Sequence, residues 1–245
     1  MDNKTQVVQL GLLDFEAAQA LQEKLVEARK KKAIPDTLLL LSHPDVITLG
    51  RASSRQYLRH SEEELNARGI KVVEAGRGGE VTFHGPGQLI AYPILQLRDR
   101  ERDLHGYLRS LEEIGIGICR SFGIRAQRVK ERTGVWVQGK KISAIGVRAR
   151  SWITFHGVAF NRTRDIEGFH LIVPCGIADA GVTSLEHILD KAVSAQDLQK
   201  RFCLQFAEVF KRELLKITPA ELHQQISEIS HRSKPTTRPP EPRTE

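Results

Sequence analysis

One cysteine in this sequence stands in a setting that suits covalent chemistry. Cys175 lies in a Pro-Cys-Gly turn, whereas Cys119 and Cys203 fall beside apolar helical stripes and are interpreted as core residues. A loop cysteine is either a nucleophile or an inert, partly buried thiol, and composition alone favours the inert thiol. With a reference pKa near 8.5, only about 3% of such a thiol is ionised at pH 7. A nucleophilic Cys175 therefore needs a cation or a base beside it.

Histidines and one lysine pair are the candidates for that supporting role. A lone histidine is usually structural and a lysine beside a turn is usually solvated, so residue type alone leaves every candidate open. The motifs HExxH, HxxxH and GxSxG are absent and the acidic residues form no cluster, so we expect no metal site, no α/β-hydrolase and no cofactor. The candidates are His43, His84, His156, His170 and the adjacent Lys140 and Lys141.

A glycine-rich segment at residues 77–88 also indicates a site. It contains four glycines and one proline in twelve residues, and it precedes the apolar run 89–97. Glycine permits positive φ and close backbone approach, so the segment is typical of a loop shaped around a ligand. It matches neither GxGxxG nor GxxxxGK[ST], and no helix is expected after it, which argues against a phosphate-binding loop. A plain glycine hairpin would not explain its polar members, Arg77, Thr82, His84 and Gln88.

The surrounding pattern predicts the helices and strands that would position these residues. Asp14 is expected to cap a first helix, and Ser61 with Glu64 forms a capping box for a short second one. Pro93 would place the strand 89–97 at a sheet edge or a bulge. Residues 161–183 are expected to form a loop with one short helical turn. Strands are expected at 6–10, 37–41, 46–49, 70–73, 134–137, 141–147 and 153–160, and helices from 104 to a stop at Gly123, over 195–214, and over 219–229 behind Thr218.

The composition is that of a globular protein with one core. The chain has 245 residues, a formal net charge of +7 and three cysteines without CxxC spacing, which suits a reducing cytoplasm. Neither a secretory leader nor an apolar run of roughly 20 residues is visible, so we expect a soluble protein. The positive charge would suit a nucleic acid, a membrane surface or an acidic protein about equally. Residues 1–230 are expected to form a single catalytic domain and residues 231–245 a disordered tail.

Four ordered blocks of the sequence resemble the octanoyltransferase family, the lipoyl(octanoyl) transferases. The first block is the glycine-rich segment 77–88, read as RGGxxTFHxxGQ. The second is GKKISAIG at 139–146, and the third is FHGVAFN at 155–161. The fourth is Pro-Cys-Gly at 174–176 followed by VTSL at 182–185. The resemblance runs from about residue 5 to about residue 215, and four blocks in order are far more specific than any one of them.

This resemblance implies an acyl transfer between two proteins. The octanoyl group would move from the thioester of acyl carrier protein to a specific lysine, either on the lipoyl domain of a 2-oxoacid dehydrogenase E2 subunit or on the glycine cleavage H protein. That transfer is the first step of endogenous protein lipoylation. It further implies an α/β fold with a central mixed sheet flanked by helices, related to biotin and lipoate protein ligases. No nucleic-acid or membrane partner is implied. The positive net charge of the domain suits an acidic acyl carrier protein.

The resemblance also assigns roles to individual residues. Cys175 would be the nucleophile that forms an octanoyl thioester, and Lys141 would lower its pKa and later carry the proton of the attacking amine. The family spacing places the catalytic lysine directly before Ile142, which selects Lys141 over Lys140. The acyl pocket would be lined by Arg77, Gly78, Gly79, Glu80, Val81, Thr82, Phe83, His84, Ala144, Ile145, Gly146, Gly157, Val158 and Ala159.

Two other functions stay open at this point. An ATP-dependent lipoate or biotin protein ligase shares the expected fold but activates a free acid and needs no cysteine nucleophile. A non-catalytic basic module would instead bind nucleic acid with a steep dependence on salt and would form no acyl-enzyme. An octanoyl adduct on Cys175 is required by the transferase interpretation alone.

Overall fold

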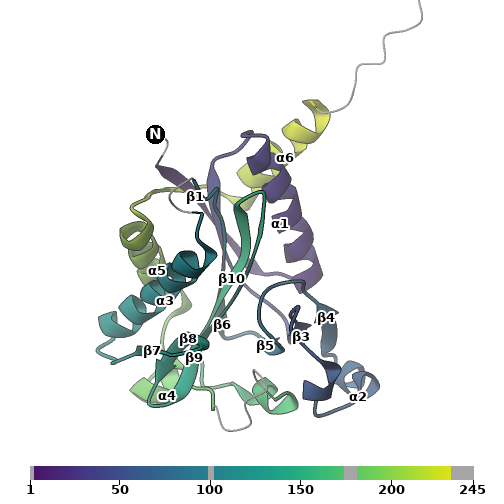
Figure 1. Ribbon diagram of the computed structural model, residues 1–245, viewed down its shortest axis with the longest axis vertical. Helices are drawn as coiled ribbons and strands as arrows, with labels where there is room; N and C mark the ends of the chain where they lie inside the picture. Colours follow the sequence, from purple (N-terminus) through teal and green to yellow (C-terminus); the bar gives the residue numbers. More distant parts are fainter. Residues whose placement is uncertain (1–2, 99–101, 174–180, 233–245) are drawn as a thin grey trace, which may run out of the picture.

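The computed structural model describes residues 3–98, 102–173 and 181–232, and its centre is one mixed eight-stranded sheet (Figure 1). The strands run across the sheet in the order β11 (Glu213–Lys216), β1 (Lys4–Leu12), β2 (Asp36–Ser42), β6 (Gln88–Ile94), β10 (Ile153–Asn161), β9 (Lys140–Arg150), β8 (Arg132–Val137) and β7 (Gln127–Val129). β1 pairs in parallel with both β2 and β11, and the other neighbours pair antiparallel. The expected central mixed sheet is confirmed.

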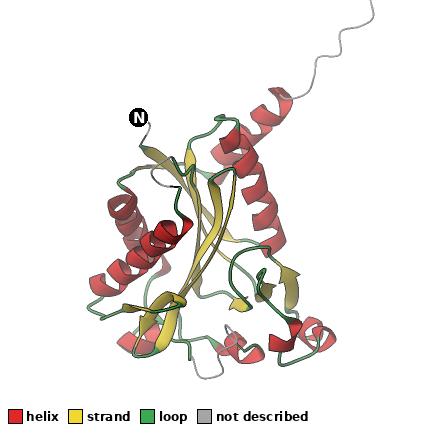
Figure 2. Ribbon diagram, in the orientation of Figure 1, coloured by secondary structure: helices red, strands yellow, loops and turns green. Residues whose placement is uncertain are grey.

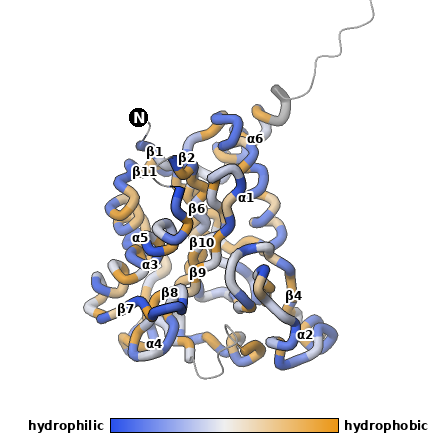
Figure 3. The backbone as a smooth tube through the Cα atoms, in the orientation of Figure 1, coloured by the Kyte–Doolittle hydropathy of each residue, from blue (hydrophilic) through white to orange (hydrophobic). Residues whose placement is uncertain are grey.

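Helices cover both faces of this sheet (Figures 1 and 2). α1 (Phe15–Lys30) and α6 (Pro219–Arg232) lie on one face, and α3 (Leu104–Ser121) and α5 (Ala195–Phe210) lie on the other. Because side chains alternate along a strand, Leu38 and Leu40 of β2 join the core with α3 and α5, whereas Leu39 and Leu41 join the core with α1. Burial on both faces explains the continuous apolar run Leu38 to Leu41 of β2. Figure 3 shows the central strands in paler and more orange shades than the outer helices.

A smaller three-stranded sheet lies beside the main one. Its strands are β4 (Lys71–Glu74), β3 (Val46–Leu49) and β5 (Thr82–His84), in that order. Ile47, Leu65 and Phe169 belong to its separate core, which joins α2 (Glu62–Ala67) and the short helix η3 (Glu167–Leu171). The remaining short helices are η1 (Arg55–Tyr57) and α4 (Leu185–Leu189). This sheet carries the glycine-rich segment and holds it against β9.

The predicted helix starts are confirmed. The Asp14 carboxylate accepts hydrogen bonds from the backbone N–H groups of Glu16 and Ala17 at 2.9 and 3.2 Å. Ser61 and Glu64 form the expected reciprocal capping box at α2. Thr218 Oγ1 accepts from the Glu221 N–H at 3.2 Å and caps α6. Each cap satisfies backbone donors that the first helical turn leaves unpaired.

Pro93 lies in the interior of the main sheet, so its expected edge position is wrong. Ala91 pairs with Val158 and Gln96 with Ile153, and this register places Pro93 opposite His156. His156 has a φ of 55° and donates its N–H to Gln22 Oε1 at 2.7 Å. The ladder between β6 and β10 is therefore interrupted where proline has no N–H to donate.

The helix expected over residues 195–214 is too long by four residues. It ends at Phe210 because Lys211 adopts a φ of 52°, and the chain continues as β11. Leu214 lies in that strand, opposite Thr5 of β1. Among the residues that the structure describes, no helix combines the length and the apolar composition needed to cross a membrane.

Candidate active site

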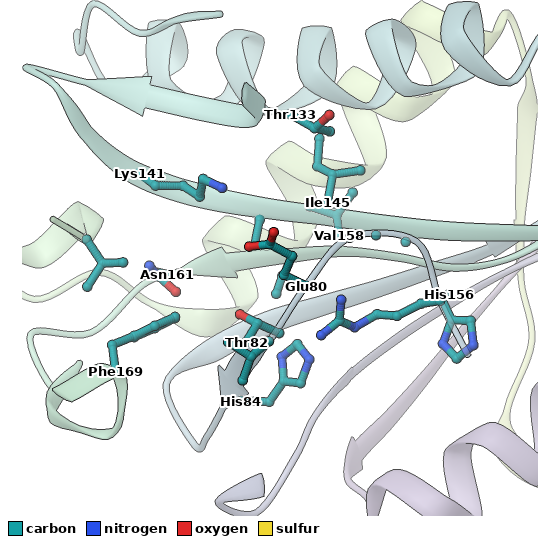
Figure 4. A pocket seen from close by; sticks show the side chains of 18 of the residues that line it. Glu80, Thr82, His84, Thr133, Lys141, Ile145, His156, Val158, Asn161 and Phe169 are labelled. Carbon is teal, nitrogen blue, oxygen red and sulfur yellow. The ribbon is translucent and has the colours of Figure 1, made fainter. Parts of the chain in front are cut away.

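A cavity of about 250 Å³ lies between the glycine-rich segment and strands β9 and β10 (Figure 4). It brings together residues from all four sequence blocks, with Val182 from the fourth. Among the residues singled out from the sequence, those that line it are Arg77, Gly79, Glu80, Val81, Thr82, His84, Lys141, Ala144, Ile145, Gly146, His156, Gly157, Val158 and Ala159. In Figure 4, Lys141, Asn161 and Phe169 lie toward one side of the cavity and His156 lies on the other side.

The register of β9 and β10 explains why two separate blocks form one wall. Ala144 pairs with Ala159, Ile145 with Val158, and Gly146 with Gly157. A Cβ atom on Gly146 would lie 2.8 Å from the Gly78 carbonyl oxygen, so the missing side chain allows the glycine-rich segment to approach. The wall is consequently narrow and built mainly from backbone and small apolar side chains.

Two of the predicted lining residues lie outside the cavity wall. Gly78 donates its N–H to the Val147 carbonyl at 2.9 Å and thereby ties the segment to β9. Phe83 turns into the core of the smaller sheet, where its ring meets Phe169 at a centroid distance of 5.7 Å. Strand alternation accounts for Phe83, because its neighbours Thr82 and His84 face the cavity. Both residues position the wall without forming it.

Arg77 is a buried cation that anchors the glycine-rich segment. Its Nη2 donates to the carbonyl oxygen and the hydroxyl of Thr48, each at 2.8 Å, and its Nη1 donates to the Gly78 carbonyl at 3.0 Å. These bonds fix the segment to β3. The guanidinium also lowers the pKa values of nearby histidines.

Lys141 lies at one end of the cavity with a defined orientation. Its Nζ stands 4.8 Å from the centroid of the Trp136 ring, and its stem passes over Gly134, where an added Cβ would lie 3.4 Å from the Lys141 Cε. Lys141 is partly buried, whereas Lys140 is exposed on the opposite side of the strand. The electrostatic attraction of an aromatic face for a cation holds the ammonium group at this position.

Residues 181–183, which come six to eight positions after Cys175 in the sequence, are bonded to the backbone of Lys141. The Lys141 N–H donates to the Gly181 carbonyl at 2.9 Å, and the Lys141 carbonyl accepts from the Thr183 N–H at 3.0 Å. Val182 lines the cavity at the same end. Cys175 itself lies outside the described residues.

A chain of side-chain hydrogen bonds links His84 to this same end of the cavity. His84 Nδ1 donates to Gln88 Oε1 at 3.1 Å, and Gln88 Nε2 donates to Asn161 Oδ1 at 3.0 Å. Asn161 Nδ2 in turn donates to the Thr183 carbonyl at 3.0 Å. Burial, followed by the charges of His43 and Arg77, holds the pKa of His84 well below its usual value, so its ring is neutral near pH 7.

The other candidate histidines occupy different environments. His43 is buried, donates from Nδ1 to the Leu13 carbonyl and accepts at Nε2 from the Tyr92 hydroxyl at 2.8 Å. Burial lowers its pKa. His156 is only 1% exposed, and a hydrogen bond between its ring and the Ala75 backbone partly opposes the lowering of its pKa. Burial, and then the cations Arg77 and Arg148, lower the pKa of His156 to about 4. His170 is exposed on η3 and does not line the cavity.

Several lining residues were not identified from the sequence. Phe15 and Tyr92 close the end near His156, where Phe15 and His156 lie 6.4 Å apart between ring centroids. In the sequence, Phe15 and Tyr92 look like ordinary core residues. Their spacing from other apolar residues is the same as that of side chains that are packed on all sides. Asn161 belongs to the third sequence block and could have been found from its position there. The remaining missed members are Glu131, Arg132, Thr133, Phe169 and Val182.

This geometry suits a narrow apolar substituent whose reactive end lies near a cation. Ala144, Ile145, Val158 and Ala159 form an apolar wall, and the Glu80 carboxylate faces the middle of the cavity in Figure 4. Lys141 supplies positive charge at one end, where a thiolate or a developing oxyanion would be stabilised. No group of three or more potential metal-binding side chains is present within residues 3–98, 102–173 and 181–232.

Comparison with known proteins identifies the family. The family described as the lipoyl protein ligase A/B catalytic domain matches residues 14–207. An octanoyltransferase of Geobacter metallireducens is 45% identical over 212 residues, which are 86% of this chain and 96% of that protein. An octanoyltransferase of Chloroflexus aggregans is 46% identical over 207 residues, covering 83% and 94% of the two chains.

Solved structures share the fold at low sequence identity. A bipartite lipoate protein ligase of Thermoplasma acidophilum, studied with its E2 lipoyl domain, superposes with a TM-score of 0.72 at 16% identity over 94% of this chain and 93% of that one. Lipoate-protein ligase A bound with ATP gives a TM-score of 0.71 at 15% identity over 96% of both chains. The fold relationship expected from the sequence blocks is confirmed. The chain belongs to the octanoyltransferases, acyltransferases that carry the lipoyl protein ligase A/B catalytic domain.

Proposed function

We propose that this chain moves an octanoyl group from octanoyl-acyl carrier protein to one lysine of a lipoyl domain through a thioester on Cys175. The observation that carries the proposal is the position of Lys141, at the end of an apolar cavity and bonded to the segment that follows Cys175. The net charge of +7 suits an acidic carrier protein, mainly through the rate of encounter. The E2 lipoyl domain named with the archaeal ligase supports the class of acceptor. The glycine cleavage H protein is the second acceptor that we propose.

The first half of the reaction forms the acyl-enzyme. Lys141 as a cation favours the Cys175 thiolate, which attacks the thioester carbonyl of the donor. The bond from that carbonyl to the carrier sulfur breaks, and the carrier thiolate leaves with a proton from the Lys141 ammonium group, which leaves Lys141 neutral. One thioester replaces another, so this step is nearly neutral in free energy.

The second half transfers the acyl group to nitrogen. The acceptor lysine, with a reference pKa near 10.4, must lose a proton before it can attack the Cys175 thioester. The ammonium form gives its first proton to solvent, and neutral Lys141 takes the second proton from the attacking nitrogen as the amide bond forms, so the Cys175 thiolate is released beside the restored cation. The narrow wall of β9 and β10 holds the alkyl chain during both steps.

Intact-mass measurement tests this mechanism most directly. After mixing with octanoyl-acyl carrier protein, the wild-type chain is expected to gain one octanoyl group on Cys175, which a lipoyl domain then removes. The variant Cys175→Ser should gain no thioester and lose transfer, whereas Cys203→Ser, which changes a partly buried thiol of α5, should keep both. Full transfer by Cys175→Ser, or transfer that requires free octanoate and ATP, would instead support a ligase.

A further inference from the structure

Glu112 is a buried carboxylate on the side of α3 that faces β8. It is only 1% exposed, and its neighbour Leu111 is fully buried in the main core, so the carboxylate is held by a rigid part of the fold. Glu112 Oε2 accepts from Arg109 Nη1 at 2.7 Å and from Arg128 Nε at 3.1 Å, which compensates its charge. Glu112 Oε1 instead accepts from the backbone N–H of Gly134 at 3.1 Å. This last bond ties α3 to β8.

The strand that Glu112 holds is irregular where it meets Lys141. The register of β8 with β9 shifts between Val135 and Trp136, and Trp136 is the residue paired with Lys141. The pairing of β8 with β7 is irregular as well. Gly134 adopts a φ of 128°, a backbone conformation that favours glycine. Irregular strand pairing re-aims side chains, so the position of this segment depends on contacts other than a regular ladder.

Gly134 and Trp136 form the surface on which the Lys141 side chain lies. A Cβ atom on Gly134 would lie 3.4 and 3.5 Å from the Cε and Cδ atoms of Lys141, so the lysine stem rests against this backbone. The same Cβ would lie 2.6 Å from the Ser143 carbonyl oxygen, so β8 and β9 approach closely here. The Trp136 ring lies 4.8 Å from Lys141 Nζ, and its indole N–H donates to the Arg132 carbonyl at 3.2 Å. A displacement of Gly134 therefore disturbs the support of both the stem and the ammonium group.

We propose that Glu112 is a positioning residue for Lys141 and acts by holding Gly134 and the irregular segment of β8 in place. The contacts run from Glu112 Oε1 to the Gly134 N–H, and from Gly134 and Trp136 to the lysine side chain. The attraction between an ammonium group and a thiolate weakens as the two separate, so a displaced Lys141 stabilises the Cys175 thiolate less. This inference rests on the proposed function, because it requires Lys141 to act on the Cys175 thiol.

The test measures the rate of iodoacetamide labelling of Cys175 between pH 5 and 10. Glu112→Met has a similar volume but removes the acceptor for Gly134, so labelling at pH 7 should slow about threefold to tenfold and the rates should converge toward pH 10. Glu112→Gln keeps an acceptor for the same N–H and should restore most of the wild-type profile. An unchanged profile in a folded Glu112→Met chain overturns the proposal. Equal slowing by Glu112→Gln also overturns it, because the charge and not the hydrogen bond would then matter.

A matched control and a double variant separate positioning from a general loss of structure. Glu113→Met is the control, because Glu113 binds the same Arg128 at 2.7 Å but is 41% exposed, and it should leave the profile unchanged. In a Lys141→Ala chain, Glu112→Met should slow labelling no further, because the group that it positions is missing. A further loss of about threefold or more in that chain overturns the proposal, since Glu112 would then act by another route.

The remaining outcomes concern the reaction itself or the folding of the variants. Absence of an octanoyl adduct on wild-type Cys175 would refute the proposed reaction, and an unchanged profile for Lys141→Ala would refute the role of Lys141 and with it that of Glu112. Should Glu112→Met not fold, Glu112→Asp replaces it: this variant keeps the charge, withdraws the acceptor by one carbon and must slow labelling only where Lys141 is present. The other charged or imidazole side chains of the cavity stay unchanged throughout, namely Arg77, Glu80, His84, Glu131, Arg132 and His156.

Discussion

Lys140 and Lys141 are chemically identical, and only their positions on β9 distinguish them. Lys140 is exposed, whereas Lys141 is partly buried and lines the cavity beside Trp136. Adjacent residues of a strand point to opposite faces, so the strand itself separates the two roles. A cation over an aromatic face gains ~0.5–1 kcal/mol, more when water is excluded, which is enough to favour one side-chain position.

Replacing Lys141 tests its effect on the Cys175 thiol. We expect Lys141→Ala to raise the pKa of Cys175 toward the ordinary value and to slow alkylation near pH 7 about tenfold for each pKa unit. The measurement is the rate of iodoacetamide labelling of Cys175 between pH 5 and 10, followed by peptide mass. Lys140→Ala is the matched control and should leave the profile unchanged. An identical profile for Lys141→Ala would reject its role in lowering the pKa.

At the scale of elements, the cavity wall depends on the close approach of β6 and β10. A Cβ atom on Gly157 would lie 2.3 Å from the Ala91 carbonyl oxygen and 2.8 Å from the Pro93 Cδ. The ladder of hydrogen bonds between β6 and β10 is interrupted next to this contact, between Pro93 and His156. Gly157 allows β6 and β10 to approach closely because it has no side chain. Pro93 tolerates the interrupted ladder because it has no N–H group to pair.

Gly157→Ala should destabilise the fold at this crossing. The added methyl group meets backbone that cannot move freely, so we expect the free energy of unfolding to fall by ~1–3 kcal/mol. Gly181→Ala is the control, because its Cβ would meet only the flexible Lys140 side chain at 3.4 Å. Urea unfolding monitored by tryptophan fluorescence should show a lower midpoint for Gly157→Ala alone. Equal midpoints would show that β6 and β10 separate readily at this point.

At the scale of the whole molecule, three buried histidines lie where the two sheets and α1 meet, and two of them, His84 and His156, line the cavity. His43 follows β2, His84 ends β5 and His156 lies in β10, so both sheets and α1 contribute to their burial. Burial lowers the pKa of all three, and Arg77 adds to the effect on His84 and His156. Protonation of any of them is therefore linked to loss of the folded state.

This linkage predicts a loss of stability in mild acid. His156 has a folded pKa of about 4 and an unfolded pKa near 6.5, so the unfolded chain binds more protons between these values. The free energy of unfolding should be highest above pH 6.5 and should fall by up to about 3 kcal/mol from this residue as the pH drops toward 4. Urea unfolding at pH 7, 6 and 5 measures the slope. His156→Asn should flatten it in part, and an unchanged slope would contradict the assignment to His156.

Much of the local structure and part of the site followed from the sequence alone. Capping residues such as Asp14 and Ser61 and the strands β9 and β10 are recognisable because each depends on its own residue types and near neighbours. The cavity-lining glycines Gly146 and Gly157 were assigned through the family blocks. The choice of Lys141 over Lys140 came from the spacing of the family block. The family itself followed from four blocks in order.

Tertiary structure alone decided how these pieces meet. Pro93 occupies a central strand because His156, more than sixty residues later in the chain, turns its N–H toward Gln22. Phe15 and Tyr92 join the cavity, and Phe83 leaves it, through packing between elements that no local pattern records. Periodicity reports which face of an element is buried, but the partner of that face depends on long-range contacts. The sequence thus determined the family, because each block is a local pattern, and the arrangement of the two sheets decided which side chains meet in one cavity, because that depends on contacts between distant segments.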